Sequence, residues 1–136
     1  MRILKLLLAS FMIFSLGYSC GAQSEKGGNT VVNTKSPKVE VYYFHYTHRC
    51  VTCRTVESES KRIVGKLYGK KVSFTALNLD EPDGSKKGKA LDVSGQTLLI
   101  ICGNKKINLT TEGFMYAVNN PDKLEKIIKE NIDPLL

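Results

Sequence analysis

Tryptophan is absent from this chain, and only four of its 136 residues are cysteine. So few cysteines exclude the dense disulfide scaffold of small secreted domains. The longest apolar stretch has only eleven residues, which is too short for a helix that spans a bilayer about 30 Å thick. The remaining composition, 42% hydrophobic and 24% charged, excludes disorder along the full length, and the length suits one folded domain.

The apolar stretch, residues 6–16, follows the basic residues Arg2 and Lys5. This order is typical of an export signal, and we expect residues 1–19 to be a signal peptide. The segment Leu-Gly-Tyr-Ser-Cys that ends at Cys20 resembles a bacterial lipoprotein box. The resemblance implies that Cys20 carries lipid and anchors the mature chain in the bacterial cell envelope, facing the periplasm. Ordinary secretion with a free Cys20 is the alternative.

Residues 20–38 are polar, rich in glycine and without sustained periodicity, which predicts a flexible tether. The folded domain is then residues 39–136. Loss of residues 1–19 would remove two basic residues and lower the formal charge from +7 to +5. The lysines are scattered and are not interleaved with aromatic residues, which favours a solvated surface over a nucleic-acid partner. We expect the domain to be a monomer.

Hydrophobic periodicity predicts the element order β-α-β-α-β-β-α. We expect strands at residues 39–46, 71–80, 97–102 and 106–110, and helices at residues 51–68, 85–91 and from Pro121 onward. A strand, a helix and a second strand imply a right-handed parallel crossover. The later hairpin adds antiparallel strands. The predicted fold class is therefore α/β, with a mixed four-stranded sheet and helices on both faces.

Cys50 and Cys53 lie where the first strand is expected to end and the first helix to begin. Unpaired N–H groups and the positive end of the helix dipole stabilise a thiolate there. Two cysteines on the first turn project toward the same side, so a disulfide can close between them. We expect Cys50 to be the accessible nucleophile with the lower pKa, and Cys53 to be the resolving thiol on the core side. Arg49 and Arg54 flank the pair and favour an anion further.

Half of a zinc site and a structural disulfide are the other interpretations of this pair. A zinc site of the common kind needs a second Cys-x-x-Cys pair or a histidine pair at ligand spacing, which the sequence lacks. A disulfide within one helical turn constrains little of the unfolded chain and would stabilise the fold weakly. The strand–helix context therefore favours redox chemistry.

The order of elements and the cysteine motif resemble a thioredoxin-like domain without its N-terminal extra strand and helix. The resemblance covers residues 39–134. A second match is the strand that ends at Asp80, followed later by the Val-Ser-Gly-Gln-Thr turn of residues 93–97 into an apolar strand. Residues 44–54, with Glu57 after them, are also similar to a small group of exported bacterial proteins catalogued as nitrophenyl-compound nitroreductase subunits.

Three positions depart from the family pattern. Gln96, before Thr97, stands where the family has its cis-proline, so we expect a trans peptide in the loop that normally packs on the cysteines and docks substrate. Phe44 stands at the position of the family's buried acid, which would leave Cys53 without its usual base. Arg49 replaces the aromatic residue before the first cysteine. These departures imply a specialised electron carrier and not a general protein reductase.

Four further side chains are candidates around the motif. His48 could stabilise the thiolate, act as an acid or base near neutral pH, or complete a copper or zinc site with the two cysteines. We expect His45 to be a strand residue whose nitrogens are satisfied locally. Glu57, one turn after the motif, is either a proton acceptor or a solvated helix position. Cys102 ends an apolar strand and is expected to pack as a small hydrophobe.

Together these features predict a membrane-tethered thiol–disulfide oxidoreductase or electron carrier. Cys50 would exchange with a disulfide- or dithiol-bearing protein partner, Cys53 would resolve the mixed disulfide, and a membrane-linked redox partner would reset the pair. This chemistry needs no cofactor, and we expect no metal. The alternatives are a copper- or zinc-binding module that uses Cys50, Cys53 and His48, and a non-catalytic subunit of a larger reductase.

Overall fold

The computed structural model describes residues 37–136, so the expected signal peptide, Cys20 and residues 20–36 of the expected tether lie outside the described residues. The elements are β1 (Val39–His45), α1 (Val51–Tyr68), β2 (Ser73–Asn78), α2 (Pro82–Ala90), β3 (Thr97–Cys102), β4 (Lys105–Asn108), α3 (Thr110–Tyr116), α4 (Pro121–Ile132) and the 3₁₀ turn η1 (Asp133–Leu135). Within the described residues, no helix is long and apolar enough to cross a membrane.

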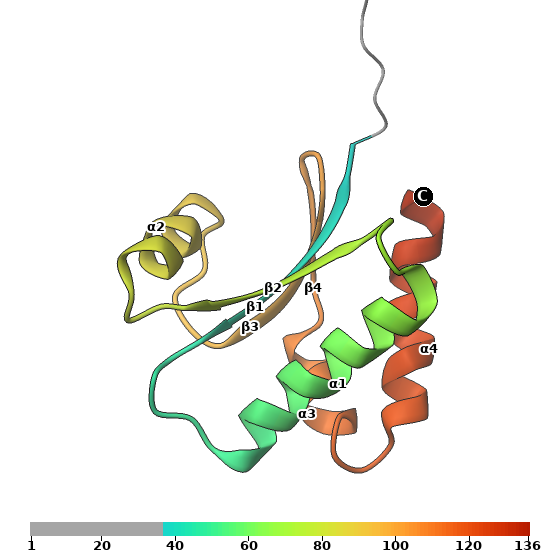
Figure 1. Cartoon of the computed structure of the whole chain (residues 1–136), viewed down its shortest axis with the longest axis horizontal. Coiled ribbons are helices and arrows are strands. Elements are labelled where there is room, and N and C mark those ends of the chain that lie inside the picture. Colours follow the sequence, from blue (N-terminus) through green and yellow to red (C-terminus); the bar gives the residue numbers. More distant parts are fainter. Residues whose placement is uncertain (1–36) are drawn as a thin grey trace, which may run out of the picture. The chain divides into compact units, whose positions relative to one another are not determined.

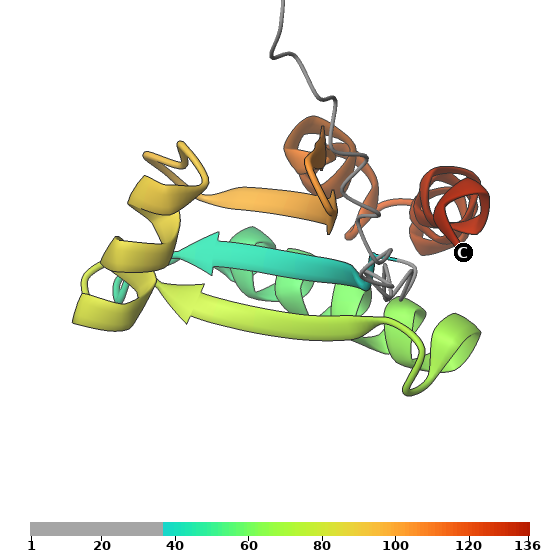
Figure 2. The same ribbon diagram turned by 90° about the horizontal axis from the view of Figure 1, so that it is seen from above.

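The four strands form one mixed sheet in the order β2-β1-β3-β4 (Figures 1 and 2). β1 pairs in parallel with β2, where Tyr43 lies opposite Ala76, and antiparallel with β3, where Tyr43 lies opposite Leu98. β4 pairs antiparallel with β3. Because parallel neighbours need a crossover connection, α1 links β1 to β2 across one face of the sheet. The predicted sheet is confirmed.

Side chains of the central strand β1 alternate between two apolar cores, one on each face of the sheet. Tyr43 belongs to the larger core, which the sheet forms with α1, α3 and α4. Phe44 belongs to the smaller core on the opposite face, where its ring lies 3.9 Å from the Cβ position of Gly88 in α2. Figure 1 shows this division, with α2 on one side of the sheet and the other helices on the other side. Burial of β1 on both faces agrees with its β-branched and aromatic sequence.

The described elements differ from the predicted ones in one helix and in several ends. The short helix α3 was not predicted, and the final helix is therefore the fourth. α2 begins at Pro82 instead of residue 85, because proline fits the first turn of a helix, where its missing N–H would have no intrahelical partner. β2 is shorter than predicted at both ends. The start of α4 is as predicted, with the Asn120 side chain accepting a hydrogen bond from the Lys123 N–H at 3.1 Å.

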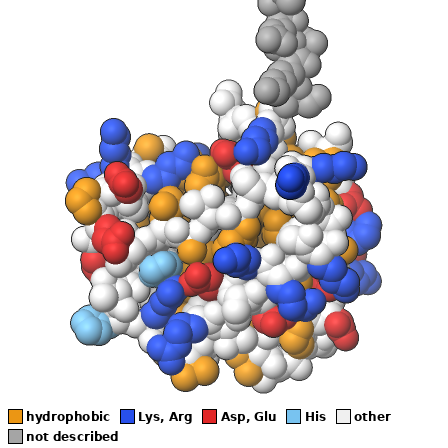
Figure 3. All heavy atoms as spheres, viewed as in Figure 1, with side chains coloured by type: hydrophobic (Ala, Val, Ile, Leu, Met, Phe, Trp, Pro, Cys, Tyr) orange, Lys and Arg blue, Asp and Glu red, His pale blue; other side chains and the backbone are white. Residues whose placement is uncertain are grey.

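The visible face of the domain carries basic and acidic side chains side by side (Figure 3). Lys and Arg are interspersed there with Asp and Glu instead of forming one continuous basic stripe. Two ion pairs join separate elements: Lys66 of α1 with Glu125 of α4 at 2.8 Å, and Lys106 of β4 with Asp92 at 2.9 Å. Exposed pairs of this kind contribute at most about 1 kcal/mol each.

Candidate functional site

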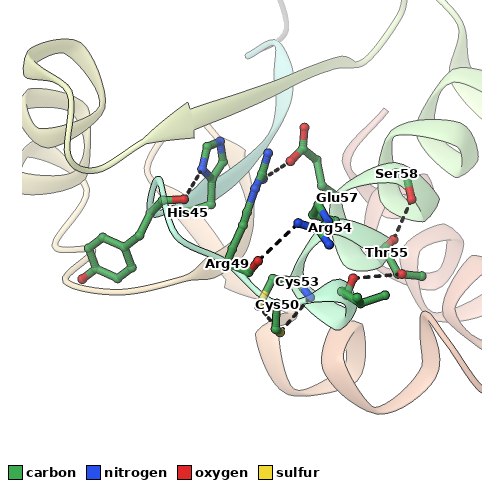
Figure 4. Close-up of polar contacts among 10 residues, drawn as sticks. His45, Arg49, Cys50, Cys53, Arg54, Thr55, Glu57 and Ser58 are labelled. Carbon is green, nitrogen blue, oxygen red and sulfur yellow. Dashed lines mark hydrogen bonds and ion pairs between the residues drawn. The ribbon is translucent and has the colours of Figure 1, made fainter.

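The two cysteines of the motif lie at the N-terminus of α1, which follows the C-terminal end of the central strand β1. Cys50 is the N-cap residue, and its sulfur accepts a hydrogen bond from the Cys53 N–H at 3.4 Å. The Sγ atoms of Cys50 and Cys53 lie 2.7 Å apart, and both residues are free thiols (Figure 4). Cys50 is exposed, whereas Cys53 is buried. The structure thus brings together the two expected thiols and gives them different access to solvent.

The surroundings of the two thiols shift their pKa values in opposite directions. The hydrogen bond from the Cys53 thiol, followed by backbone N–H groups at the helix terminus, lowers the pKa of Cys50. Burial raises the pKa of Cys53, and its contact with the Cys50 sulfur raises it further. At a given pH the exposed sulfur therefore carries more thiolate, which is the nucleophilic form.

Arg49 and Glu57 form an ion pair beside the cysteines (Figure 4). The pair joins the residue before the motif to the second turn of α1, and its side chains are only 21% and 24% exposed. Glu57 is therefore a half-buried, paired carboxylate and not the solvated helix position considered above. The positive charge of Arg49 is partly neutralised, so it favours a nearby anion less than the bare sequence implies. Arg54 is exposed, and its guanidinium lies 3.5 Å from the Arg49 carbonyl oxygen.

The loop between β1 and Cys50 is tied to the end of β2. The Thr47 N–H donates to the Asp80 carboxylate at 2.7 Å, and this bond holds the pKa of Asp80 below its usual range. The Asn78 side-chain amide donates to the Thr47 hydroxyl at 2.9 Å. These two bonds fix the path of the chain into the motif, although the sequence match at Asp80 did not indicate that role.

Neither histidine of the chain joins the cysteine pair in a metal site. The His45 ring nitrogen lies 3.0 Å from the Tyr46 carbonyl oxygen, as expected for a locally satisfied strand residue. His48 is exposed on the loop before Cys50. Among residues 37–136, no three His, Cys, Asp or Glu side chains are grouped so that they could hold a metal ion. The alternative set of Cys50, Cys53 and His48 therefore does not form a three-ligand cluster.

Gln96 lies in the loop before β3. Its peptide bond is trans, as expected, since the described residues contain no cis peptide. Gln96 lowers the pKa of the Cys53 thiol, against the larger effect of burial, and the Gln96 Oε1 atom is buried without a hydrogen-bond partner. The Thr97 hydroxyl donates to the Gly95 carbonyl oxygen at 3.0 Å and does not bond the cysteines. Gln96 and Thr97 also line an open cavity of about 570 Å³ beside β4.

Cys102 lies at the opposite end of the sheet from the motif. It pairs with Val39 at the start of β1, whereas the motif follows the end of that strand. Its half-buried thiol lies 3.5 Å from the Pro37 carbonyl oxygen. Cys102 therefore does not contribute a third thiol to this site.

Tyr43 is a residue of the site that sequence reasoning missed. Phe44 was aligned with the family's buried acid, but the structure places Phe44 in the core on the α2 side. Tyr43 faces α1 instead, and its buried hydroxyl experiences the charges of Cys53, Arg49 and Glu57. The alternation of side chains along β1 could have indicated that Tyr43 and not Phe44 faces α1, because neighbouring residues of a strand lie on opposite faces.

Among the comparisons with known proteins, a solved structure indicates the fold. No family model matches the chain, and no curated protein matches it. Thioredoxin O2 from Arabidopsis thaliana in its oxidised state superposes with a TM-score of 0.51 at 20% identity, over 69% of this chain and 75% of that one. This chain has the thioredoxin-like fold.

Two other thioredoxin structures resemble this chain less closely. The germline-specific thioredoxin Deadhead from Drosophila melanogaster gives a TM-score of 0.47 at 21% identity, over 69% of this chain and 81% of that one. Fasciola hepatica thioredoxin gives a TM-score of 0.47 at 17% identity, over 74% of this chain and 86% of that one.

Proposed function

We propose that this thioredoxin-like domain is a thiol–disulfide oxidoreductase or electron carrier that works through Cys50 and Cys53. The observation that carries the proposal is the asymmetry of the pair at the N-terminus of α1. An exposed thiol with a lowered pKa lies 2.7 Å from a buried thiol with a raised pKa. Thiol–disulfide exchange needs such a division between an attacking and a resolving sulfur.

The proposed reaction in the reducing direction has two steps. The Cys50 thiolate attacks one sulfur of the partner's disulfide, forms a mixed disulfide, and the other partner sulfur leaves as a thiolate. Cys53 then gives its proton to the thiolate released in the first step and attacks the Cys50 sulfur, so that the intramolecular disulfide forms and the second partner thiolate leaves. The two electrons come from the two cysteines, and no dissociable cofactor is required. The oxidising direction is the same sequence in reverse.

We further propose that the chain works in the bacterial envelope, tethered by lipid on Cys20 and reset by a membrane-linked redox partner. The apolar stretch at residues 6–16 and the lipoprotein-like segment that ends at Cys20 support this proposal. Metabolic labelling with radioactive palmitate tests it. Cys20→Ser should lose the label, while Cys102→Ser should keep it. An unlabelled full chain would contradict the lipid anchor.

The resemblance of residues 44–54 and Glu57 to exported nitroreductase subunits supports the alternative that this domain is a non-catalytic subunit of a larger reductase. The ion pair between Arg49 and Glu57 lies within that segment and next to Cys50.

Capture of a mixed disulfide tests the exchange reaction. Cys53→Ser removes the resolving thiol but leaves Cys50 able to attack, so disulfide-linked complexes should accumulate in cells that express the full chain. Cys50→Ser should abolish them, and Cys102→Ser, at the far end of the sheet, should still cycle normally. Complexes that form equally without Cys50 would contradict the proposal. Tight Cu(I) or Zn(II) binding that blocks exchange would favour the metal-binding alternative instead.

A further inference from the structure

The strand β2 forms one edge of the sheet and pairs with β1 alone (Figure 2). Just beyond the strand, the Leu79 N–H bonds the His45 carbonyl oxygen at 2.7 Å, so the backbone groups of Leu79 point toward β1. Successive residues of a strand direct these groups to opposite sides. Phe74 and Ala76 lie an odd number of residues before Leu79, so their N–H and C=O groups point outward. Within residues 37–136, no other element bonds these groups.

The next residue of β2 that points outward, Asn78, is already covered. Its carbonyl oxygen accepts a hydrogen bond from the Glu81 N–H at 3.1 Å. Helix α2 also packs so closely there that a Cβ on Gly84 would lie 1.9 Å from the same oxygen. The open edge of β2 therefore consists of Phe74 and Ala76, each with one backbone donor and one backbone acceptor.

The sequence of β2 does not protect this open edge. Edge strands of monomeric proteins commonly carry lysine, proline or a bulge, which prevent pairing with another chain. The strand Ser73–Asn78 contains no charged residue and no proline, and none of its residues is buried, whereas β1 and β3 are mostly buried. The opposite edge strand, β4, carries Lys105 and Lys106. The sheet thus protects the β4 edge and leaves the β2 edge able to accept a strand.

We propose that two copies of this chain pair through β2, antiparallel and edge to edge, about a twofold axis at Thr75. A twofold axis makes the contact reciprocal, so Phe74 of each copy lies opposite Ala76 of the other. The two residues of such a pair exchange both of their backbone hydrogen bonds. Every group of the open edge then has a partner. A twofold axis at Ala76 would instead direct Phe74 at the covered residue Asn78.

The charges at the two ends of β2 complement each other in this arrangement. Lys70 and Lys71 precede the strand, Asp80 and Glu81 follow it, and all four are exposed. Antiparallel pairing about Thr75 places Lys70 of each copy opposite Asp80 of the other. Opposite charges at the rim of an interface orient the encounter and suppress other partners. A second copy of this chain is therefore the occupant that the edge fits.

The paired strands would also extend the larger core. Phe74 is half-buried and packs against that core on the α1 side, and its cross-strand neighbour Ala76 of the second copy would lie on the same face. Because β2 runs parallel to β1, the antiparallel contact places the two cysteine motifs at opposite ends of the joined sheet. Both motifs stay accessible. The dimer departs from the monomer expected from the sequence, and it does not depend on the proposed exchange reaction.

Amide hydrogen exchange of the unsubstituted full chain tests the contact directly. At about 1 mM chain the amides of Phe74 and Ala76 should exchange slowly, and at about 10 μM they should exchange freely, because dilution dissociates the dimer. The Lys106 amide on the β4 edge is the control and should exchange freely at both concentrations. Free exchange of Phe74 and Ala76 at both concentrations would overturn the proposal. Slow exchange at both would show instead that the edge is covered within one chain, which also overturns it.

Substitutions of Thr75 test the position of the axis. Thr75 is exposed, so Thr75→Lys leaves the monomer intact but places two like charges directly opposite each other. It should raise the dissociation constant of the dimer about fivefold, while Thr75→Ser should not change it. Sedimentation equilibrium measures both constants. Equal constants for the two variants would contradict an axis at Thr75.

Disulfide cross-linking tests the same axis by distance. Residues on the axis form a pair without mutual hydrogen bonds, whose Cα atoms lie about 4.5 Å apart, within the range of a disulfide. Thr75→Cys is introduced into the full chain after serine has replaced Cys20, Cys50, Cys53 and Cys102. Mild oxidation should link this variant at least about tenfold faster than Lys105→Cys in the same background. Equal rates would indicate random collision and overturn the dimer, while the exchange reaction, which this background lacks, would be unaffected.

Discussion

The two sulfurs of the motif differ in burial and in their position relative to the helix terminus. Cys50 caps α1 and is exposed, so N–H groups and the neighbouring thiol favour its ionised form. Cys53 is one turn into the helix and faces the core, where burial disfavours the charge. The same three-residue spacing that lets the sulfurs meet therefore assigns them different chemistry.

Alkylation as a function of pH tests this difference. Because the pKa of Cys50 is lowered and that of Cys53 is raised, Cys50 should react with iodoacetamide at the lowest pH and Cys53 last. Peptide mass spectrometry of the reduced full chain after short exposure gives the extent of labelling at each cysteine. Equal labelling profiles for Cys50 and Cys53 would contradict the asymmetry.

Sequence reasoning predicted the positions of the two sulfurs but not the side chains that surround them. The motif at a strand–helix junction was sufficient to place Cys50 at the helix terminus. The ion pair of Arg49 with Glu57 depends on how the loop folds back on α1, and Gln96 approaches Cys53 from a loop more than forty residues later. The spacing of these residues along the sequence does not indicate that they lie near one another in the fold. Phe44, expected at the position of the family's buried acid, lies in the core on the α2 side, because neighbouring residues of a strand face opposite sides of the sheet.

Helices α1 and α2 both contain glycine, but only in α2 does close packing require it. In α2, a Cβ on Gly84 would lie 1.9 Å from the Asn78 carbonyl oxygen, so only glycine lets the helix pack against the end of β2. In α1, a Cβ on Gly65 would meet nothing within 4 Å. The first glycine is required by close packing, while the second is only a weak helix former.

Two alanine substitutions test this contrast. Gly84→Ala should lower the free energy of unfolding by about 1–3 kcal/mol or more, since backbone must move to relieve the overlap. Gly65→Ala should raise it by about 0.5–1 kcal/mol, because alanine favours the helix and has open space. Urea unfolding of both variants measures the two changes. A Gly84→Ala variant as stable as the unsubstituted chain would show that α2 does not pack so closely on β2.

Asp133, at the end of α4, makes the free energy of unfolding depend on pH. Its carboxylate pairs with Lys129 and accepts a hydrogen bond from the Tyr68 hydroxyl at 2.7 Å, and these contacts lower its pKa. A carboxyl whose pKa is lowered by folding stabilises the fold above its unfolded pKa and loses that contribution as the pH falls through its folded pKa. Asp133→Asn should therefore be less stable than the parent near neutral pH, and the difference should shrink in acid.

Urea unfolding at neutral and acidic pH measures this effect. Glu130→Gln is the control, because the Glu130 carboxylate lies 3.9 Å from Lys126 in an exposed pair and its removal should change little at either pH. A constant difference between Asp133→Asn and the parent across the pH range would contradict the assigned role.

The sequence predicts a helix correctly where the apolar periodicity extends over many residues, and misses a helix that is short. The eighteen residues of α1 carry a clear apolar stripe and were predicted with the correct ends. The seven residues of α3 include Gly113 and begin after Leu109, which caps the helix without a side-chain hydrogen bond. Packing explains this helix, since a Cβ on Gly113 would lie 3.0 Å from Val56 in α1 and 3.4 Å from Leu98 in β3. Tertiary contacts of this kind have no local signal.

Across the whole domain, the sheet separates the working cysteines from the third described cysteine. β1 carries the chain from its pairing with Cys102 at one end to the motif at the other. The hydrogen bonds from Thr47 and Asn78 fix the loop at the motif end of β1. The fold thus holds one reactive pair within residues 37–136 and keeps Cys102 away from it.

The equilibrium between dithiol and disulfide tests the central claim most directly. The full chain is equilibrated in glutathione buffers of graded potential, quenched with acid and alkylated, and the fraction of Cys50–Cys53 disulfide is measured. We predict a reversible two-electron transition above about −300 mV, in the range of disulfides that exchange and not of structural ones. Cys53→Ser should abolish this transition, and Cys102→Ser should leave it unchanged. A pair that stays fully reduced or fully oxidised in every buffer would contradict the account.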